Sequence, residues 1–590
     1  MALAETVLRK IHKLGLIPKI IKFLPLCSFL LAVSSILYLI SLPMDGNYRN
    51  TYISENALMP AQVTSYFRES EWNIVRGYRE SITKLSDQDV SSRNKILESW
   101  LEQLGLTTSY HVNGFANDTL YAIMHAPRGE NTEAMALVVP WATSEGKYNS
   151  GAMALAMGLA RYFTRMSIWS KNIVFVFPPD SRKSLRSWVD AYHTDLDETA
   201  GSIEAAVVLE YDETLGDYFE FIDMFYHGLN GQFPNLDLLN TANVINYHEN
   251  IKVSIEGIDN KNIDYTTRLL TLVKGIISSC LTGLTQENTN GCEEFSGWQI
   301  QAITLRARTK DKGEEHRDIT QLGRVVDGTF RSVNNLLEKF HQSFFFYLLM
   351  SSKNFISIGT YLPAAVILAV SLAISALSAI LSIDRNEAIS NLSFILRTFT
   401  YVEIVCLGLA LSIPKLVATS EGDQVSAVSL LVLSSLGFLS VGSIFFKKRL
   451  SKTITFSLIS LSLLLISLLI TALLIVHFSL ALMIGILVLP LTFVPTLMNQ
   501  FTGQDFKDKA YIGTIICLIV SNPFFVVLTA GNVLGNGSDL FEGLVLAWND
   551  LQCWTWLVVI LGWFPCWIVI TGCFMFYKID IDELLKKKLQ

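Results

Sequence analysis

Long apolar runs constrain the fold of this chain more than any other feature. One run covers residues 20–42, and seven more follow residue 350, each close to the roughly 20 residues that an α-helix needs to cross a bilayer. The later runs lie at 356–382, 392–413, 425–446, 454–476, 479–498, 511–530 and 552–577. Because 51% of the residues are hydrophobic and only 17% are charged, the chain is predicted to be a membrane protein with eight transmembrane helices.

The segment between the first two runs has the ordinary composition of a globular domain. A large extramembrane domain is therefore predicted between the first span and a bundle of seven. The predicted parts are an N-terminus (1–19), the first span (20–42), the globular domain (43–350), the membrane domain (351–577) and a tail (578–590). The net charge of -7 and the lack of a basic stripe interleaved with aromatic residues argue against nucleic-acid binding.

Basic residues predict that both ends of the chain are cytosolic. Several precede the first run, and no small-residue cleavage site follows it, so this run is predicted to be a signal anchor. With alternating spans, the clusters at 447–449, 507–509 and 586–588 all fall on the cytosolic side, as the positive-inside rule requires, and the globular domain is lumenal. Lys587 and Lys588 have the spacing of a dilysine signal for retrieval to the endoplasmic reticulum; a plain cytosolic lysine cluster is the alternative.

Two further features fit an oxidising, glycosylating lumen. Asn117 begins an Asn-Asp-Thr acceptor sequon for N-glycosylation. Among the eight cysteines, Cys280 and Cys292 lie well inside the globular domain and could form a local disulfide. The others lie in or beside apolar runs, and the chain has no Cys-x-x-Cys motif of a zinc ribbon or redox site.

Short apolar runs alternate with helical patterns along the predicted lumenal domain. Strands are predicted at 119–125, 134–141, 172–177, 205–211 and 301–306. Helices are predicted at 151–163, 181–196, 235–248, 265–284 and 321–349. The aromatic stretch 330–350 is interpreted as an interfacial helix that leads into the second span. This alternation predicts an α/β domain with a mostly parallel sheet and flanking helices.

The order of these elements resembles that of zinc aminopeptidases. In that family a His-x-Asp, a bridging acid, a later Asp and a late His hold two metal ions that activate water, and a Glu-Glu pair supplies the general base. Here residues 140–142 read Pro-Trp-Ala at the first position, and 146–149 lack the bridging acid. Asp180, Glu210 and Glu293 remain as vestigial positions, all carboxylates, so the zinc site is predicted to be degenerate and no cofactor is expected. A weak calcium- or magnesium-type site stays open.

Several longer stretches carry a second and more specific resemblance. They lie, in order along the chain, at 43–46, 48–60, 66–73, 125–129, 187–193, 228–231, 234–237, 334–347 and 562–567. These stretches are similar to the GPI-anchor attachment protein, the large polytopic subunit of the GPI transamidase complex, in its fungal-type members. The resemblance implies a complex in the endoplasmic reticulum membrane. That complex cleaves a C-terminal signal from a proprotein and joins the new carboxyl end to the ethanolamine of a GPI lipid.

The resemblance also implies a division of labour. In that family a separate cysteine-protease-like subunit carries out catalysis, while this subunit helps to bring the lipid anchor and to hold the complex together. The chain is therefore expected to be a non-catalytic pseudo-peptidase whose partners are the other subunits, the GPI lipid, the proprotein signal and the membrane. Two alternatives stay open: a lumenal metal-dependent peptidase or peptide-bond-forming enzyme, and a lipid transporter.

Four polar residues just after the first span are candidate ligands for a glycolipid head group or a tethered substrate. Tyr52, Ser54, Glu55 and Asn56 lie about 10–14 residues beyond that span, so they reach at most ~35–50 Å from the membrane. Their hydroxyl, amide and carboxylate groups suit glycan hydroxyls or an ammonium. The alternative is a strand or cap that ties the first span to the domain.

Two residues inside the predicted spans are further candidates. Pro565 removes one backbone hydrogen bond from the last span and frees the carbonyl near Leu561, which needs another partner in lipid. The resemblance associates this proline with anchor recognition; a kink that serves only subunit packing is the alternative. Glu403 lies near the middle of the third span, where an acid is costly and either faces a protein or anchor contact or is protonated.

Overall fold

The computed structural model describes residues 16–112, 118–259, 263–285, 289–309, 316–419, 450–502, 507–535, 537 and 539–577. The chain divides into an α/β unit, Leu42–Thr360, and a helical unit formed by Met1–Ser41 with Tyr361–Gln590. The predicted glycosylation site Asn117, the lysines Lys587 and Lys588, and the predicted span 425–446 lie outside the described residues.

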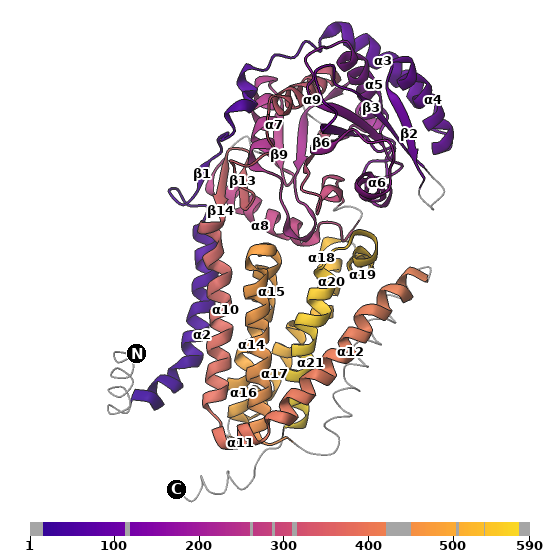
Figure 1. Cartoon of the computed structure of the whole chain (residues 1–590). Helices are drawn as coiled ribbons and strands as arrows, with labels where there is room; N and C mark the ends of the chain where they lie inside the picture. The colour runs from indigo at the N-terminus through magenta and orange to yellow at the C-terminus, as the bar shows by residue number, and fades with distance from the viewer. Residues whose placement is uncertain are drawn as a thin grey trace, which may run out of the picture. The chain divides into compact units, whose positions relative to one another are not determined.

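A central sheet of nine strands organises the described part of the α/β unit (Figure 1). The order across it is β10-β9-β8-β11-β6-β4-β5-β3-β2. The strands are β2 (Thr107–His111), β3 (Thr119–Met124), β4 (Glu133–Val138), β5 (Asn172–Phe177), β6 (Ser202–Glu210), β8 (Phe221–Phe225), β9 (Lys252–Ile255), β10 (Ile258–Asp259) and β11 (Gln301–Arg308). The central strands read as continuous apolar runs because helices cover both of their faces.

Parallel pairing is confined to part of this sheet. Strands β5, β4, β6 and β11 form a parallel centre, and β8 pairs with β9 in the same sense. The pairings β2–β3, β3–β5, β8–β11 and β9–β10 are antiparallel. The prediction of a mostly parallel sheet therefore holds at the centre and is wrong at the edges, where short connections join consecutive strands such as β9 and β10.

Side chains of the sheet alternate between two hydrophobic cores. In β4, Met135 and Leu137 join the core that contains residues of α5 (Ser150–Thr164) and α9 (Ile319–Asn334). Ala136 and Val138 point to the opposite core, with residues of α6 (Lys183–Thr194). The remaining helices of the unit are α3 (Glu69–Thr83), α4 (Val90–Gln103), α7 (Leu236–His248) and α8 (Tyr265–Leu281).

Short elements complete the α/β unit. Its one-turn 3₁₀ segments are η1 (Asn56–Leu58), η2 (Pro60–Gln62), η3 (Glu213–Leu215), η4 (Leu229–Gly231) and η6 (Cys292–Phe295). Two small sheets pair β7 (Tyr218–Phe219) with β12 (Arg317–Asp318), and β1 (Arg49–Asn50) with β14 (Asn354–Ser357) and β13 (Tyr347–Ser351).

The aromatic stretch before the second span is not helical. Helix α9 ends at Asn334, and β13 pairs antiparallel with β14, so the predictions of a helix over 321–349 and of an interfacial helix over 330–350 are wrong beyond α9. The Tyr347 ring is fully buried, and its hydroxyl donates to the Pro234 carbonyl oxygen at 2.9 Å. Phe340 and Tyr347 therefore belong to the α/β core and Phe344 packs against it, whereas Phe346 is exposed.

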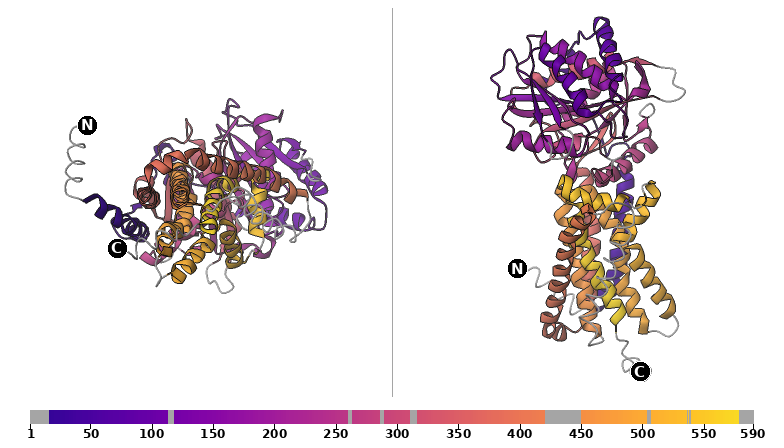
Figure 2. Two further views of the ribbon diagram at one scale, coloured as in Figure 1. Left: turned by 90° about the horizontal axis from the view of Figure 1, so that it is seen from below. Right: turned by 90° about the vertical axis from the view of Figure 1, so that its right-hand side faces the viewer.

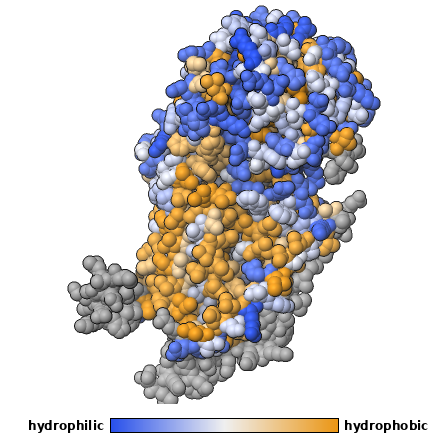
Figure 3. Space-filling view, viewed as in Figure 1, coloured by the Kyte–Doolittle hydropathy of each residue, from blue (hydrophilic) through white to orange (hydrophobic). Residues whose placement is uncertain are grey.

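The helical unit consists of long apolar helices that run side by side and of short helical segments between them (Figures 1 and 2). They are α2 (Leu16–Ser41), α10 (Ile358–Leu381), α11 (Arg385–Ser390), α12 (Leu392–Thr419), α14 (Lys452–Val476), α15 (Phe478–Val488), η7 (Leu489–Phe493), α16 (Val494–Asn499), η8 (Gln500–Thr502), α17 (Lys507–Val520), α18 (Pro523–Leu534), α19 (Asp539–Leu551), α20 (Thr555–Leu557), η9 (Val558–Trp563) and α21 (Phe564–Phe576). Hydrophobic side chains cover most of this unit's visible surface (Figure 3).

Among the described residues, six helices are long and apolar enough to cross a membrane, or seven if one bent pair counts as a span. These segments coincide with seven of the eight predicted spans, and the eighth, 425–446, falls on residues outside the description. The bent pair, α17 and α18, turns by 64° and replaces the straight span predicted at 511–530. Pro523 has no N–H to continue α17, and Asn522 Oδ1 caps α18 by accepting from Phe524 N and Phe525 N, both at 2.9 Å.

Serine side chains join neighbouring membrane helices. Ser28 Oγ on α2 donates to the Ser371 carbonyl oxygen on α10, and Ser371 Oγ donates back to the Ser28 carbonyl oxygen, both at 2.8 Å. Ser460 and Ser467 on α14 donate to carbonyl oxygens of α10 at 2.7 and 2.8 Å. Small hydroxyl side chains let helix backbones approach closely in lipid, so this pattern fixes α10 between α2 and α14.

Candidate functional site

Buried acids hold the polar segment that follows the first span. Asp237 Oδ2, on α7, accepts from the backbone N–H groups of Ser54 at 2.9 Å and of Glu55 at 2.7 Å. The buried Glu55 carboxylate accepts from the backbone N–H groups of His341 at 2.9 Å and Gln342 at 2.8 Å. Ser54 and Glu55 therefore fix this segment to the rest of the α/β unit by hydrogen bonds. This agrees with the alternative interpretation of the segment as a strand or cap that has a structural role.

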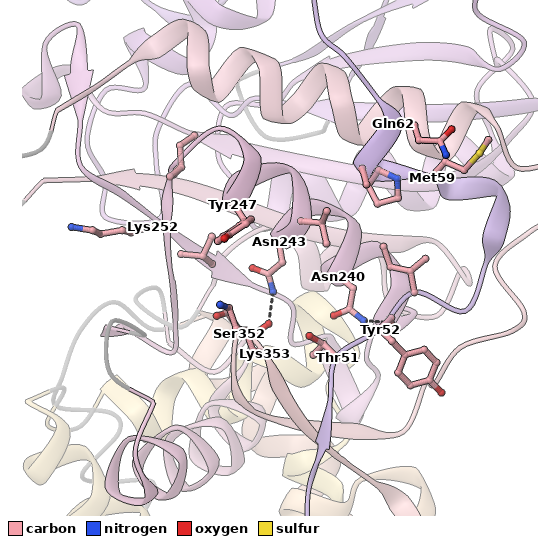
Figure 4. A pocket seen from close by; sticks show the side chains of 16 residues that line it. Thr51, Tyr52, Met59, Gln62, Asn240, Asn243, Tyr247, Lys252, Ser352 and Lys353 are labelled. Carbon is pink, nitrogen blue, oxygen red and sulfur yellow. Dashed lines mark hydrogen bonds between the residues drawn. The ribbon is translucent and has the colours of Figure 1, made fainter.

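A pocket of about 610 Å³ lies beside Tyr52, between that segment, α7 and the β13–β14 turn (Figure 4). Asn240 Nδ2 donates to the Tyr52 carbonyl oxygen at 2.7 Å, and Asn243 Nδ2 donates to the Ser352 carbonyl oxygen at 3.0 Å. Figure 4 shows Tyr52 at one end, Lys353 toward the other, and the two amides between them. Of the four predicted residues in this segment, Tyr52 is the one that lines the pocket, while Asn56 is exposed at the start of η1.

The vestigial carboxylate Glu210 is bound to a cation of the chain itself. Glu210, at the end of β6, is fully buried and faces Arg306 in register on β11. Arg306 Nε donates to Glu210 Oε2, while Arg306 Nη2 donates to Ser144 Oγ at 2.5 Å and to Asn290 Oδ1 at 2.9 Å. The other carboxylate oxygen, Glu210 Oε1, accepts from Ser144 N at 2.9 Å. Both oxygens are thus engaged by protein donors.

The other two vestigial acids also bind backbone groups. Asp180 Oδ1 accepts from Arg182 N at 2.9 Å and Oδ2 accepts from Ser184 Oγ at 2.5 Å, which caps the turn into α6. Glu293 Oε1 accepts from Asn290 N at 2.6 Å. Among the described residues, no three His, Cys, Asp or Glu side chains cluster as metal ligands would. An all-carboxylate set whose oxygens hold backbone and guanidinium donors does not fit a zinc centre.

Two adjacent glutamates in η6 are buried next to these positions. Glu293 and Glu294 are both fully buried, and neither Glu294 carboxylate oxygen accepts a hydrogen bond from a described residue. Burial raises the pKa of Glu294 well above its ordinary range, and the charge of Glu293 adds to this rise against the opposing charges of Arg186 and Arg182. Ionisation of the Glu294 carboxyl therefore costs the folded state stability.

Replacing Glu294 by glutamine is expected to stabilise the α/β unit at high pH. A carboxyl with a raised folded-state pKa contributes stability below its unfolded pKa of about 4.3, and this contribution falls as pH rises toward the folded pKa. Relative to wild type, Glu294→Gln should gain at least about 1 kcal/mol of unfolding free energy between pH 5 and pH 8. Denaturant unfolding of the full chain in detergent measures this gain, and an unchanged difference at the two pH values would contradict it.

The predicted disulfide is not formed. Cys280, on α8, and Cys292, in η6, lie in the described part of the chain, and no disulfide joins them. Cys292 is buried and its thiol points to the His227 carbonyl oxygen at 3.8 Å and to Glu293 Oε2 at 3.7 Å. Burial raises the pKa of the Cys292 thiol well above its ordinary value, so it behaves as a small core residue.

In the helical unit, Pro565 follows a widened turn instead of a simple kink. The segment η9 is a π-helix in which the Phe564 N–H reaches back to the Val559 carbonyl oxygen, and Pro565 lies buried in the first turn of α21. The wider turn directly before the proline relieves the clash between the ring and the preceding carbonyl groups. The sequence indicated a distorted helix here but not the π-helix.

Three tryptophans of the last span donate to carbonyl groups beside helix breaks, one of which, that of Leu518, also accepts from Ser521 Oγ at 3.4 Å. Trp556 Nε1 donates at 3.1 Å to the carbonyl of Ala410, four residues before Pro414 on α12. Trp563 Nε1 donates to the Ser521 carbonyl oxygen at 3.1 Å and Trp567 Nε1 to that of Leu518 at 2.8 Å, both beside the α17–α18 break. These tryptophans carry no motif in the sequence; Pro414, four residues after Ala410, is the local signal that the Ala410 carbonyl needs another donor.

Glu403 lies at the same helix interface as Pro565. It is partly buried on α12, one turn before the buried Cys406. Cys566 directly follows Pro565, and α12 packs against both η9 and α21. The structure therefore brings together the two candidates inside the spans, far along the chain from the Tyr52 segment.

These features define a membrane protein of many spans that carries a large α/β unit of mixed sheet. Comparison with protein families shows that the chain belongs to the Gaa1-like family of GPI transamidase components, whose model matches residues 116–571. It is 42% identical to the GPI transamidase component GAA1 of Saccharomyces cerevisiae, over 97% of each chain. It is 30% identical to the GPI transamidase component gaa1 of Schizosaccharomyces pombe, over 84% of this chain and 86% of that one. The predicted family and its fungal type are confirmed.

Solved structures resemble part of the chain at low identity. The glutaminyl cyclase of Porphyromonas gingivalis matches 45% of this chain and 99% of its own, with 9% identity and a TM-score of 0.28. A zinc aminopeptidase from Bacillus subtilis matches 37% of this chain and 50% of its own, with 11% identity and a TM-score of 0.25.

Proposed function

We propose that this chain is a non-catalytic subunit of a GPI transamidase in the endoplasmic reticulum membrane, where it contributes to recognition of the GPI lipid and to assembly of the complex. Membership of the Gaa1-like family supports the role in GPI attachment. The buried ion pair of Glu210 and Arg306 supports a non-catalytic role. The Arg306 guanidinium binds the carboxylate that a metallopeptidase would use as a metal ligand. A dizinc peptidase would need that oxygen for its metal.

The proposal includes the topology and the partners that the sequence predicted. Both termini are cytosolic and the α/β unit is lumenal, with a glycan on Asn117 and retrieval by Lys587 and Lys588. The partners are a cysteine-protease-like catalytic subunit, the other subunits, the GPI lipid and the C-terminal signal of the proprotein. The lipid meets the chain in the membrane at Glu403 and Pro565, which lie at one helix interface.

Affinity purification of the full chain in mild detergent tests this proposal. A cysteine-protease-like subunit and GPI lipid should co-purify with wild type. Asp180→Asn keeps an oxygen that can accept from Arg182 N, so the variant should attach GPI anchors at a rate within twofold of wild type. An enzyme that uses Asp180 as a metal ligand would instead lose about 10- to 100-fold in activity. Absence of the protease-like partner would contradict the proposal.

A further inference from the structure

The pocket beside Tyr52 has lysines but no acid in its lining. Lys252 and Lys353 belong to its lining, and none of its sixteen lining residues is Asp or Glu. The Lys353 ammonium lies 5.4 Å from the centre of the Tyr247 ring, which holds it at the pocket, and it forms no ion pair with a described carboxylate. Figure 4 shows Lys353 beside Tyr247 and Asn243, whereas Lys252 extends away from them. An anionic group is the natural complement of Lys353.

The same pocket offers an acceptor that nothing satisfies. Asn240 is 3% exposed, and its amide nitrogen is fixed by the Tyr52 carbonyl oxygen, so the position of Oδ1 is fixed as well. That oxygen accepts no hydrogen bond from any described residue. A buried acceptor left without a donor destabilises the chain, and a ligand hydroxyl would remove this penalty. The lining of the pocket therefore favours a ligand that has both a hydroxyl donor and a negative charge.

Two aromatic rings and an apolar wall complete the lining. Tyr52 is 49% exposed and Tyr247 is 69% exposed, and the aliphatic residues Ile53, Val244 and Ile251 also line the pocket. Amphipathic tyrosine rings suit a ligand that is polar on its edges and apolar on its faces, as a pyranose ring is. The volume of about 610 Å³ is typical of small-molecule sites and holds more than a single phosphate.

Chain connectivity keeps the pocket near the bilayer. Thr51 follows the end of α2 at Ser41 by ten residues, and Lys353 precedes the start of α10 at Ile358 by five. At no more than about 3.6 Å per residue, Lys353 lies within ~18 Å of the start of that membrane helix. The head group of a lipid in the lumenal leaflet can reach such a distance.

We infer that this pocket binds a phosphorylated glycan carried by a membrane lipid. Lys353 pairs with the phosphate, Asn240 Oδ1 accepts from a sugar hydroxyl, and Tyr247 and Tyr52 pack against the sugar rings. The inference rests on the proposed function, which makes a glycolipid the substrate of the complex, and it names the part of that lipid which this chain recognises and the residues that do so.

Calorimetric binding to the purified full chain in detergent tests the ligand class. The probes are a synthetic mannotrioside bearing phosphoethanolamine, the same mannotrioside without phosphate, and inorganic phosphate. The phosphorylated mannotrioside should bind, and Lys353→Gln and Tyr247→Ala should each weaken it at least tenfold. Lys84→Gln, which changes an exposed lysine paired with Glu80, is the matched control and should leave binding unchanged. Equal binding of inorganic phosphate, or unchanged affinity in both pocket variants, would overturn the inference.

A second arm distinguishes a lipid-borne glycan from a free one. The phosphorylated mannotrioside attached to a diacyl lipid in nanodiscs should bind at least tenfold more tightly than the soluble form, because the membrane raises its effective concentration at the pocket. Equal affinity for the soluble form would overturn the lipid-borne source. Since both substituted side chains are exposed at the pocket, the variants should still co-purify the protease-like subunit. Loss of that subunit from wild type would contradict the proposed function instead.

Discussion

Arg306→Ala is expected to lower the stability of the α/β unit by about 3–5 kcal/mol, because it leaves the fully buried Glu210 carboxylate without its counter-charge. For a unit of this size the loss corresponds to a fall of roughly 5–15 °C in unfolding temperature. Ser144 N still donates to Glu210 but cannot replace a guanidinium that also binds Asn290. Thermal unfolding of the full chain in detergent, followed by intrinsic tryptophan fluorescence, measures the shift.

Two control variants distinguish the effect of breaking the buried Glu210–Arg306 pair from the effect of removing any charged side chain. Lys84→Ala removes one side of an exposed pair with Glu80 and should shift the unfolding temperature by no more than about 2 °C. The double variant Glu210→Leu with Arg306→Met replaces both charges by apolar side chains and should recover most of the loss. An Arg306→Ala protein as stable as wild type would show that the guanidinium does not compensate Glu210.

Trp556→Phe is expected to destabilise the helical unit by about 1–3 kcal/mol, since it leaves the buried Ala410 carbonyl without a donor. Phenylalanine keeps most of the ring volume, so the effect reports the lost N–H. In a membrane no water replaces that donor. Unfolding of the full chain in mixed micelles by increasing amounts of a denaturing detergent measures the change.

A second substitution on the neighbouring helix makes this prediction specific. Pro414→Ala returns a backbone N–H that can bond the Ala410 carbonyl within α12. Trp556→Phe should therefore cost less, by roughly 1 kcal/mol or more, in the Pro414→Ala background than in wild type. An equal cost in both backgrounds would mean that Trp556 stabilises the helix contact by packing alone.

The local hydrophobic pattern of the sequence predicted the central strands and helices of the α/β unit well. Strand β5 coincides with the predicted 172–177, and α5 and α7 lie within a residue or so of the predicted helices, because buried runs and helical spacing are properties of the local sequence. The failure beyond Asn334 has a distant cause. Glu55, nearly three hundred residues earlier, binds the backbone N–H groups of His341 and Gln342, and no window of local sequence contains that contact.

The candidate site likewise combines residues that the local sequence predicts with residues that only the fold brings together. The sequence predicted Glu210 as a former ligand position, but its partner Arg306 becomes evident only when β11 pairs with β6 in register. Tyr52 was a candidate, whereas Asn240 and Lys353 come from a helix and a turn far along the chain and carry no motif. The π-helix before Pro565 also depends on how neighbouring helices pack, which the apolar pattern of a span does not encode.

The metal content of the purified complex tests the central claim most directly. Zinc measured by mass spectrometry on the complex isolated in mild detergent, alongside its anchor-attachment activity, should be far below one atom per chain. The activity should also survive extended dialysis against a chelator. Stoichiometric zinc that is lost together with activity, and that disappears in a Glu210→Gln variant, would contradict the account.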